Sequence, residues 1–226
     1  MLFLALDSSA TASAALGRLE ADGQLTLLAH RSSQDTRSHA EVMTPFVTEL
    51  LQEAGVSGKD LTAVITGTGP GPFTGLRAGI VTARALAFAW GKPLYGLMSL
   101  TALAEQAAPA AREHGQNRFL VASDARRREV YSAVFELTDT GYQLVSGPTV
   151  GPAAETEDLP AYGFGTSLYP QELAAQAGFE TLQPDASDLL AAAVRLGIEN
   201  LSTDTSALYL RESDAKVPAA RKKASA

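Results

Sequence analysis

Two short segments of the sequence combine residue types that could bind a phosphorylated ligand. In the first, Asp7 directly follows an apolar stretch, and Ser8, Ser9 and Thr11 come next. A carboxylate at the end of a strand can hold a hydrated magnesium ion while the backbone N–H groups of the next turn face phosphate. The same residues could instead build a tight turn that binds nothing. The pattern alone leaves both interpretations open.

The second segment is a glycine-rich loop between residues 67 and 75. Glycine permits positive φ and close approach of the backbone to a ligand. Thr74 could cap the helix that follows, and the N-terminus of that helix would attract an anion. No Gly-Lys-Ser/Thr follows, so this is not the Walker phosphate loop. The alternative is a rigid turn that packs the helix tightly on a sheet. The candidate ligand-binding residues of the loop are Gly69, Gly71, Thr74 and Gly75.

These segments need strands and helices to position them. Apolar and β-branched stretches predict strands at residues 2–6, 12–19, 25–30, 61–66, 93–97, 119–123 and 129–137. Helical spacing of apolar residues, with Ser38 as an N-cap, predicts helices at 38–54, 74–90, 99–108, 170–177 and 186–198. Residues 146–165 are expected to be mostly loop. An initial meander followed by alternating strands and helices predicts an α/β fold with a mixed sheet. The polar segment 109–117 predicts a boundary between two lobes, 1–108 and 109–226.

The composition excludes several kinds of site and partner. The chain has no cysteine, which excludes disulfides and thiolate metal sites, and its apolar runs are shorter than the roughly 20 residues that span a bilayer. We expect a cytoplasmic protein without a membrane partner. A net charge of −7 indicates that this chain does not supply most of the phosphate contacts to any nucleic acid. Basic residues cluster only at 126–128, as a small anion or RNA patch or a solvated turn, and in a flexible C-terminal tail.

The predicted helix 74–90 is apolar around most of its circumference. Between Leu76 and Trp90 only Arg77, Thr82 and Arg84 are polar. A helix that is apolar all round needs cover on both sides, from the sheet and from a neighbouring helix of this chain or of another. The helix 38–54 also has a broad apolar face. We therefore predict a partner or dimer interface, with full burial inside the monomer as the alternative. Its residues are Val42, Met43, Phe46, Val47, Leu50, Ala78, Val81, Ala85, Phe88 and Ala89.

The motifs together resemble the bacterial TsaB family, also called YeaZ. Residues 69–77 are similar to the family's Gly-Pro-Gly-Ser-Phe-Thr-Gly-Leu-Arg, with Pro72 in place of the serine, and residues 123–131 are similar to a second signature. Tyr209 and Arg211 match its C-terminal Tyr-Xaa-Arg, expected to tie the last segment to the core. The resemblance covers nearly the whole chain. It implies an α/β fold with mixed sheets in two lobes, of the actin/Hsp70/sugar-kinase (ASKHA, ribonuclease H-like) class.

The resemblance also implies a function. Family members act as non-catalytic dimerisation or activating subunits of the complex that transfers a threonylcarbamoyl group to N6 of adenosine 37 in tRNAs reading ANN codons. The implied partners are the catalytic paralogue TsaD, the ATPase subunit TsaE, tRNA mainly through the complex, and a second copy of the chain when alone. No cofactor of its own is implied, and ATP or ADP would bind, if at all, at the shared interface.

The catalytic paralogue carries Gly-Val-Asn-His-Leu-Glu-Gly-His, whose two histidines bind a metal ion. Residues 96–103 correspond to this stretch, with Ser99 and Leu103 at the histidine positions. Leucine cannot coordinate a cation, so we expect no metal site and no metallopeptidase. The alternative function is a self-sufficient ATP-dependent phosphotransferase or ATPase of the same fold, with Asp7 and the loop at 69–75 around the nucleotide. It would need an acidic base and a Gly-Gly adenosine loop in the second lobe, and neither is evident.

Overall fold

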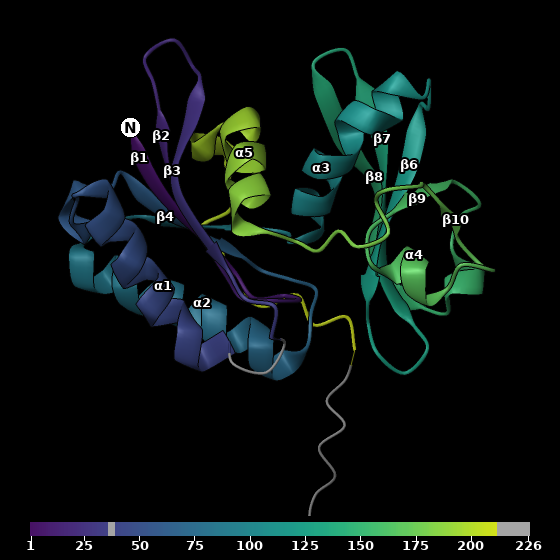
Figure 1. Ribbon diagram of the computed structural model, residues 1–226, viewed down its shortest axis with the longest axis horizontal. Helices are drawn as coiled ribbons and strands as arrows, with labels where there is room; N and C mark the ends of the chain where they lie inside the picture. The colour runs from purple at the N-terminus through teal and green to yellow at the C-terminus, as the bar shows by residue number, and fades with distance from the viewer. Residues whose placement is uncertain (36–38, 212–226) are drawn as a thin grey trace, which may run out of the picture.

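The computed structural model describes residues 1–35 and 39–211, which form two mixed sheets of five strands each. Figure 1 shows the sheets side by side, with two helices, α3 and α5, between them. Two further helices, α1 and α2, cover the outer face of the first sheet, and the short helix α4 lies on the outer side of the second. The chain therefore forms a layered α/β structure, as the alternation of strands and helices predicts.

The first sheet has the strand order β3-β2-β1-β4-β5. The first three strands form the predicted antiparallel meander, and β4 and β5 add to it in parallel. These strands are β1 (Leu2–Asp7), β2 (Ser13–Leu19), β3 (Leu25–Ser32), β4 (Ala63–Gly67) and β5 (Leu94–Leu97).

The central strand β1 is buried on both faces, which explains why all of its residues up to Asp7 are apolar. Leu4 and Leu6 pack beneath α1 (His39–Ala54) and α2 (Phe73–Trp90). Phe3 and Ala5 point the other way, toward α5 (Ala186–Leu196). Successive side chains of a strand alternate between faces, so a strand between two helical layers needs apolar residues throughout.

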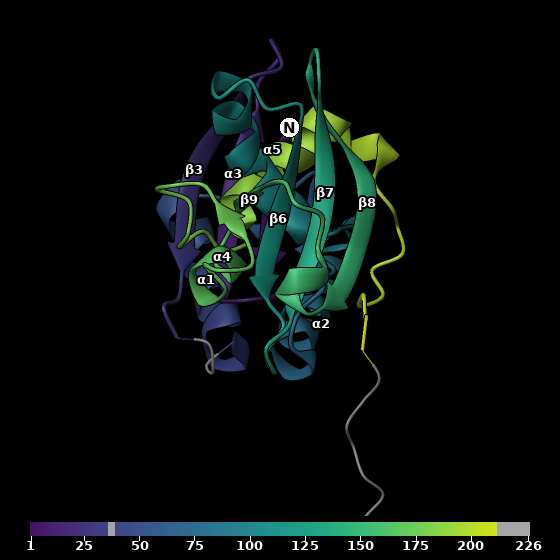
Figure 2. The same ribbon diagram turned by 90° about the vertical axis from the view of Figure 1, so that its right-hand side faces the viewer.

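The second sheet has the order β10-β9-β6-β7-β8, and Figure 2 shows it toward the viewer, with β8 at one edge. An antiparallel trio of β6, β7 and β8 carries two short parallel strands at the other edge. Its elements are β6 (Arg118–Asp124), β7 (Val130–Thr138), β8 (Gly141–Gly151), β9 (Pro160–Tyr162) and β10 (Ala174–Ala175), with α3 (Leu100–Glu113) on one face and α4 (Gly165–Leu168) on the other.

Helix α3 extends five residues beyond the predicted end at Ala108, to Glu113. Pro109 is exposed on its surface, while Ala110 and Ala111 continue the buried face against Phe119. The apolar packing thus outweighs the helix-breaking tendency of proline. The predicted division between residues 108 and 109 falls within this helix.

Two predictions in the second half of the chain are wrong. Residues 141–151 form β8 although residues from 146 on were expected to be loop, because register shifts opposite Val134 accommodate the irregular backbone around Gly147. The helix predicted at 170–177 does not form. Its alanines pair with β9 instead, Ala174 with Pro160 and Ala175 with Ala161. A stretch of about eight residues gains little from helix formation alone, so strand pairing wins.

The predicted N-cap Ser38 and the basic tail beyond Arg211 lie outside the described residues. In the part of the chain that the structure describes, no helix combines the length and the apolar character needed to cross a membrane.

Candidate functional site

The Asp7 carboxylate lies at the end of β1, fully buried, with both oxygens engaged by neighbouring side chains. Oδ1 accepts hydrogen bonds from the backbone N–H of Ser9 at 2.8 Å and from Ser9 Oγ at 2.7 Å. Oδ2 accepts a hydrogen bond of 2.5 Å from Ser99 Oγ, which itself accepts one from the N–H of Gly69 at 3.0 Å. Burial raises the pKa of Asp7, and the hydrogen bonds from Ser99 and Ser9 oppose that rise. All of these hydrogen bonds are donated by groups of the same chain, and together with burial they enclose the Asp7 carboxylate; we call this the closed site.

The glycine-rich loop packs directly against the hairpin that follows Asp7. Ser8 Oγ donates to the carbonyl of Gly75 at 2.8 Å and accepts from the N–H of Gly79 at 3.0 Å. A Cβ atom at Gly79 would lie 2.3 Å from Ser8 Oγ, and one at Gly71 would lie 2.4 Å from the carbonyl oxygen of Ser9. The glycines are therefore required for close packing of loop and helix, which is the structural alternative that the sequence left open.

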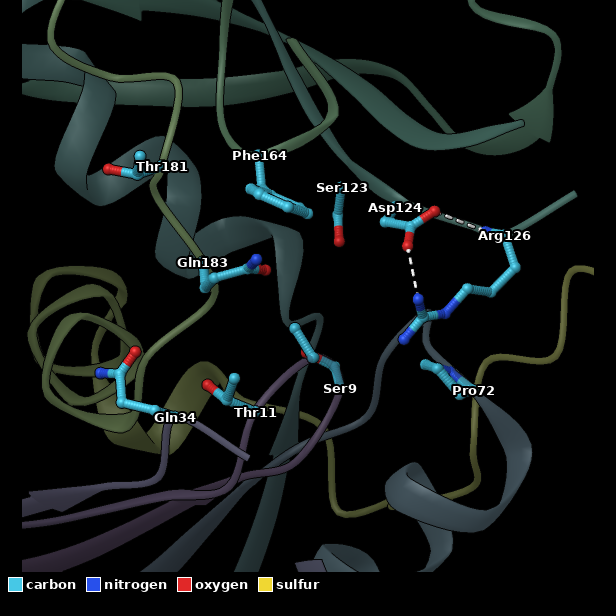
Figure 3. A pocket seen from close by; sticks show the side chains of 11 residues that line it. Ser9, Thr11, Gln34, Pro72, Ser123, Asp124, Arg126, Phe164, Thr181 and Gln183 are labelled. Atoms are coloured by element: carbon cyan, nitrogen blue, oxygen red, sulfur yellow. Dashed lines mark hydrogen bonds and ion pairs between the residues drawn. The ribbon is translucent and has the colours of Figure 1, made fainter. Parts of the chain in front are cut away.

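A cleft of about 420 Å³ opens beside this closed site, between the two sheets (Figure 3). Most of the residues that line it are of polar type, and they come from segments far apart in the chain. The lining residues are Ser9, Ala10, Thr11, Gln34, Pro72, Ser123, Asp124, Arg126, Phe164, Thr181 and Gln183. Hydroxyl, amide and guanidinium groups of this kind can bind a small polar ligand.

Only two of the eight predicted nucleotide-binding residues line the cleft, Ser9 and Thr11. The others are absent from its walls. Asp7, Ser8, Gly69, Gly71 and Gly75 are buried in the contact between loop and hairpin, and Thr74 is exposed on the first turn of α2. Gln34, Phe164 and Gln183 are not predictable from the sequence, because single polar or aromatic residues in separate loops carry no local signal.

Neither residue at the paralogue's histidine positions faces the cleft. Ser99 is fully buried and donates to Asp7. Leu103 is fully buried four residues later on α3, within the core beneath the second sheet. Both side chains serve the interior packing of the chain.

The predicted interface on α1 is wrong for three residues. Met43, Val47 and Leu50 are fully buried in the core of the first sheet, with exposed fractions of 0%, 2% and 0%. They form the stripe by which α1 rests on the sheet, and Val42 and Phe46 at its edge are partly buried against the same core. The sequence pattern showed a broad apolar face without showing which part of it the sheet covers.

The predicted interface on α2 does lie at the surface. Val81 is 61% exposed and Phe88 is 90% exposed, and Ala85 and Ala89 are exposed beside them. Ala78, on the same face, is partly buried. Spacings of three and four residues place this set along one face of the helix, here named the α2 stripe. The opposite face is buried on the sheet through Leu76, Ile80, Ala83 and Ala87.

The C-terminal segment is tied to the rest of the chain, as the Tyr-Xaa-Arg match predicts, and it contacts both α2 and the second sheet. The Nε of Arg77 donates to the hydroxyl of Tyr209 at 2.6 Å, and the Tyr209 ring packs against Phe73 with 4.8 Å between centroids. Two residues further on, Arg211 donates from Nη1 to the carbonyl of Ala125 at 3.1 Å and pairs with Glu129. Residues on both sides of the cleft are thus joined by one short segment.

The chain also resembles known proteins over most of its length. The family described as "TsaD: tRNA N6-adenosine threonylcarbamoyltransferase" matches residues 26–209. YeaZ from Pseudomonas aeruginosa has a solved structure that superposes with a TM-score of 0.75 at 31% identity, over 92% of this chain and 99% of that one. This chain belongs to the TsaB (YeaZ) family.

Two sequence comparisons agree with that placement. An uncharacterized protein of Mycobacterium tuberculosis is 38% identical over 192 residues, which are 85% of this chain and 84% of that protein. The tRNA threonylcarbamoyladenosine biosynthesis protein TsaB of Escherichia coli is 38% identical over 105 residues, 46% of this chain and 44% of that protein. The predicted family is confirmed, and so is the predicted α/β fold with mixed sheets.

Proposed function

We propose that this chain is a non-catalytic dimerisation or activating subunit of a cytoplasmic complex that transfers a threonylcarbamoyl group to N6 of adenosine 37 in tRNAs reading ANN codons. The observation that carries the proposal is that the chain closes its own Asp7 site while leaving the α2 stripe uncovered. The names of the family and of the E. coli relative support the tRNA modification.

The non-catalytic part rests on the contacts of Asp7. A carboxylate that is to hold magnesium or to act as a base must present an oxygen lone pair to a ligand. Both oxygens of Asp7 instead accept hydrogen bonds from Ser9 and Ser99, and the residue has no exposed surface. These residues do not fit a nucleotide within the chain itself. We propose that ATP or ADP is held only where this chain meets its partner.

The docking part rests on the α2 stripe. A phenylalanine that is 90% exposed, flanked by Ala85 and Ala89, offers an aromatic anchor with room for a close-packed helix. Burial of apolar surface contributes about 25 cal/mol per Å², and a standard interface buries about 1,600 Å² in total. The occupant that we propose is the catalytic paralogue TsaD, with a second copy of this chain in its place when TsaD is absent, and with TsaE joining the assembled pair.

The experiment that tests this function mixes the chain with the TsaD and TsaE proteins of its own organism and with the enzyme that supplies threonylcarbamoyl-adenylate. Modified adenosine in tRNA is then measured with each protein omitted in turn. We expect modification to fall by at least tenfold without this chain. Modification that is unchanged in its absence, or turnover of ATP by the isolated chain that Asp7→Ala abolishes, would contradict the proposal.

The docking surface is tested by Ala85→Asp, which places a charge in the middle of the α2 stripe. We expect the variant to fold and to lose co-elution with TsaD at low micromolar concentration. Leu144→Asp is the matched control, because Leu144 is a 46% exposed apolar residue on β8, in the second sheet. The control variant should co-elute normally. If Ala85→Asp also co-elutes, the partner binds another face.

A further inference from the structure

Ser123 differs from the other buried serines of the protein because its side chain has no hydrogen-bond partner. The residue is 4% exposed, and its hydroxyl forms no hydrogen bond to any other residue that the structure describes. Within residues 1–35 and 39–211, every other serine that is buried makes a side-chain hydrogen bond: Ser8, Ser9, Ser13, Ser99 and Ser132. Buried hydroxyl groups are as a rule paired. The unused hydroxyl of Ser123 therefore requires an explanation.

The hydroxyl of Ser123 opens onto the cleft between the two sheets. Ser123 lies near the end of β6 and is one of the residues that line this cleft of about 420 Å³. Among the described residues, the enclosed side-chain atoms without a partner belong to three arginines, and Ser123 Oγ is not one of them. The atom therefore keeps access to the cleft, and Figure 3 shows the hydroxyl directed into the open space.

Four further polar side chains that line the cleft are also unpaired. Thr11, Gln34, Thr181 and Gln183 form no side-chain hydrogen bond to another described residue. In Figure 3 the amide group of Gln183 is turned toward the same open space as the Ser123 hydroxyl. Donors and acceptors that converge unused on a concave site are typical of a site whose ligand supplies the partners.

The charged groups of the cleft pair with each other. Asp124 and Arg126 are the only charged residues among the described residues that line it, and Arg126 Nη1 lies 3.2 Å from Asp124 Oδ2. The second oxygen of Asp124 accepts a hydrogen bond of 2.7 Å from the N–H of Arg126. A phosphate in the cleft would meet this carboxylate without an unpaired cation to offset the repulsion. The lining therefore favours an uncharged polar ligand.

Phe164 gives the cleft a flat apolar wall. Its ring lies beside Ser123 (Figure 3) and makes no contact with another ring in the described part of the chain. Exposed aromatic rings of proteins stack on nucleobases. A glutamine amide forms two hydrogen bonds with adenine, because its oxygen accepts from N6 and its nitrogen donates to N7. The Phe164 ring and the Gln183 amide together therefore fit an adenine base.

We propose that the cleft binds an adenine base without phosphate, either as free adenosine or as an unpaired adenosine of RNA. Phe164 stacks on the base, Gln183 pairs with its N6 and N7 edge, and Ser123 supplies a further hydrogen bond. The volume lies at the lower end of the range of about 300–1,000 Å³ that small-molecule sites occupy. The site is formed by one chain, so it is separate from the partner interface at which we place ATP or ADP.

The test measures binding of adenosine to the isolated chain by calorimetry, with inosine and ATP as comparison ligands. Inosine has an oxygen in place of the N6 amino group, so the carbonyl oxygen of Gln183 loses its donor. We expect inosine to bind about fivefold more weakly than adenosine, or weaker still. ATP should bind no more tightly than adenosine, because the cleft offers its phosphates no unpaired cation.

Three variants each remove one proposed contact: Ser123→Ala, Gln183→Leu and Phe164→Leu. Ser123 and Gln183 have no side-chain partner in the free chain, so the first two variants should unfold at the same urea concentration as the wild type. Adenosine binding should weaken by about two- to tenfold in Ser123→Ala and by about fivefold or more in the other two. Gln171→Leu is the matched control, because Gln171 is exposed and does not line the cleft. It should bind adenosine as the wild type does.

A wild-type chain that does not bind adenosine at about 1 mM overturns the proposal. Equal binding by the control and all three variants overturns it too. ATP that binds about tenfold more tightly than adenosine also overturns it, because phosphate contacts would then hold the ligand.

The trinucleotide UAU distinguishes the two sources of the base. Binding as tight as that of adenosine supports an adenosine of RNA, and binding that is about tenfold weaker supports the free nucleoside. TsaD is absent from all of these titrations. A failure of the proposed function therefore leaves their outcome unchanged, and the two hypotheses can fail separately.

Discussion

Ser99 donates a hydrogen bond of 2.5 Å to Asp7, across 92 residues of sequence. The same hydroxyl accepts a bond from the N–H of Gly69, so one side chain satisfies the buried carboxylate and also fixes the start of the glycine-rich loop. Ser99, at the position where the resemblance led us to compare a histidine of the paralogue, thus serves internal hydrogen bonding. The closed site is thus a structural junction of β1, the loop and α3.

Removal of that hydroxyl should destabilise the fold. Ser99→Ala leaves the buried Oδ2 of Asp7 and the N–H of Gly69 without a partner, which costs about 1–3 kcal/mol for an unsatisfied buried group. We expect the free energy of unfolding in urea to fall by that amount. Ser167→Ala is the control, because Ser167 makes an exposed bond to the carbonyl of Phe164. Equal stability of the two variants would show that the junction contributes nothing.

Met43→Ala and Phe88→Ala should separate the two apolar faces of the outer helices. Met43 is fully buried, so its truncation should lower the free energy of unfolding by about 2–5 kcal/mol. Phe88 is 90% exposed, so its truncation should change the stability of the isolated chain by less than about 0.5 kcal/mol. Binding to TsaD, measured by calorimetry, should instead weaken by about 2 kcal/mol or more, as for a central aromatic anchor. A large loss of stability in Phe88→Ala would place that ring in the core.

Arg128→Gly should stabilise the isolated chain. Arg128 has a φ of +65°, where a residue with a Cβ atom costs about 1–2 kcal/mol more than glycine. Part of this gain is lost because glycine is more flexible in the unfolded chain. We expect a net increase of about 1 kcal/mol in thermal or urea unfolding. Arg128→Ala removes the same side chain but keeps Cβ, so it should give no increase; a gain of equal size in both variants would point to charge as the cause.

Asp188 should make stability depend on pH. Burial, together with the negative charges of Asp185 and Glu105, raises its pKa to about 7. The folded chain then keeps a proton that the unfolded chain has already released above about pH 4, so the free energy of unfolding falls as the pH rises from about 4 to 7. Asp188→Asn removes this loss. We expect the variant to exceed the wild type by roughly 2 kcal/mol more at pH 8 than at pH 5.

The contribution of the His30–Asp185 ion pair to the free energy of unfolding also falls as the pH rises. The hydrogen bond to Asp185 raises the pKa of His30, and the pair weakens as the pH rises through that value. Wild type and Asp188→Asn both contain this pair, so most of its contribution cancels in the difference between them, and what remains includes the attraction between Asp188 and His30. A difference that is the same at pH 5 and pH 8 would show that Asp188 is charged throughout that range.

The sequence predicts most of the first sheet because local pattern and packing agree there. The unbroken apolar run of β1 and the meander after it leave little choice of structure, and the resemblance fixed the family. The second half of the chain is less predictable. Ala174 and Ala175 have a high helix propensity. They form a strand because they pair with β9, a contact that the local sequence does not indicate. Residues 146–151 contain Gly147 and Pro148, which read as a loop, yet bulges keep them in β8.

The candidate site was predictable in its position and not in its contacts. Asp7 and the glycine-rich loop do meet, as the alternative function with both segments around a nucleotide required. Whether they enclose a ligand or one another depends on Ser99, which is 92 residues from Asp7 and approaches it only in the folded chain. The cleft beside them draws on Gln34, Phe164 and Gln183, from three separate loops. The burial of Met43 likewise depends on which side of α1 meets the sheet.

The packing of α5 on β1 has a consequence for how the protein is made. Phe3 and Ala5 belong to β1, while Leu189 and Leu190, which cover them, are synthesised more than 180 residues later. At about 5–20 residues per second, translation leaves this apolar face of β1 uncovered for on the order of ten seconds or more. All strands of the first sheet are complete at Leu97, so during the rest of that interval one face of the sheet lacks α5. Chaperones that bind exposed apolar strands therefore have their natural opportunity before α5 emerges.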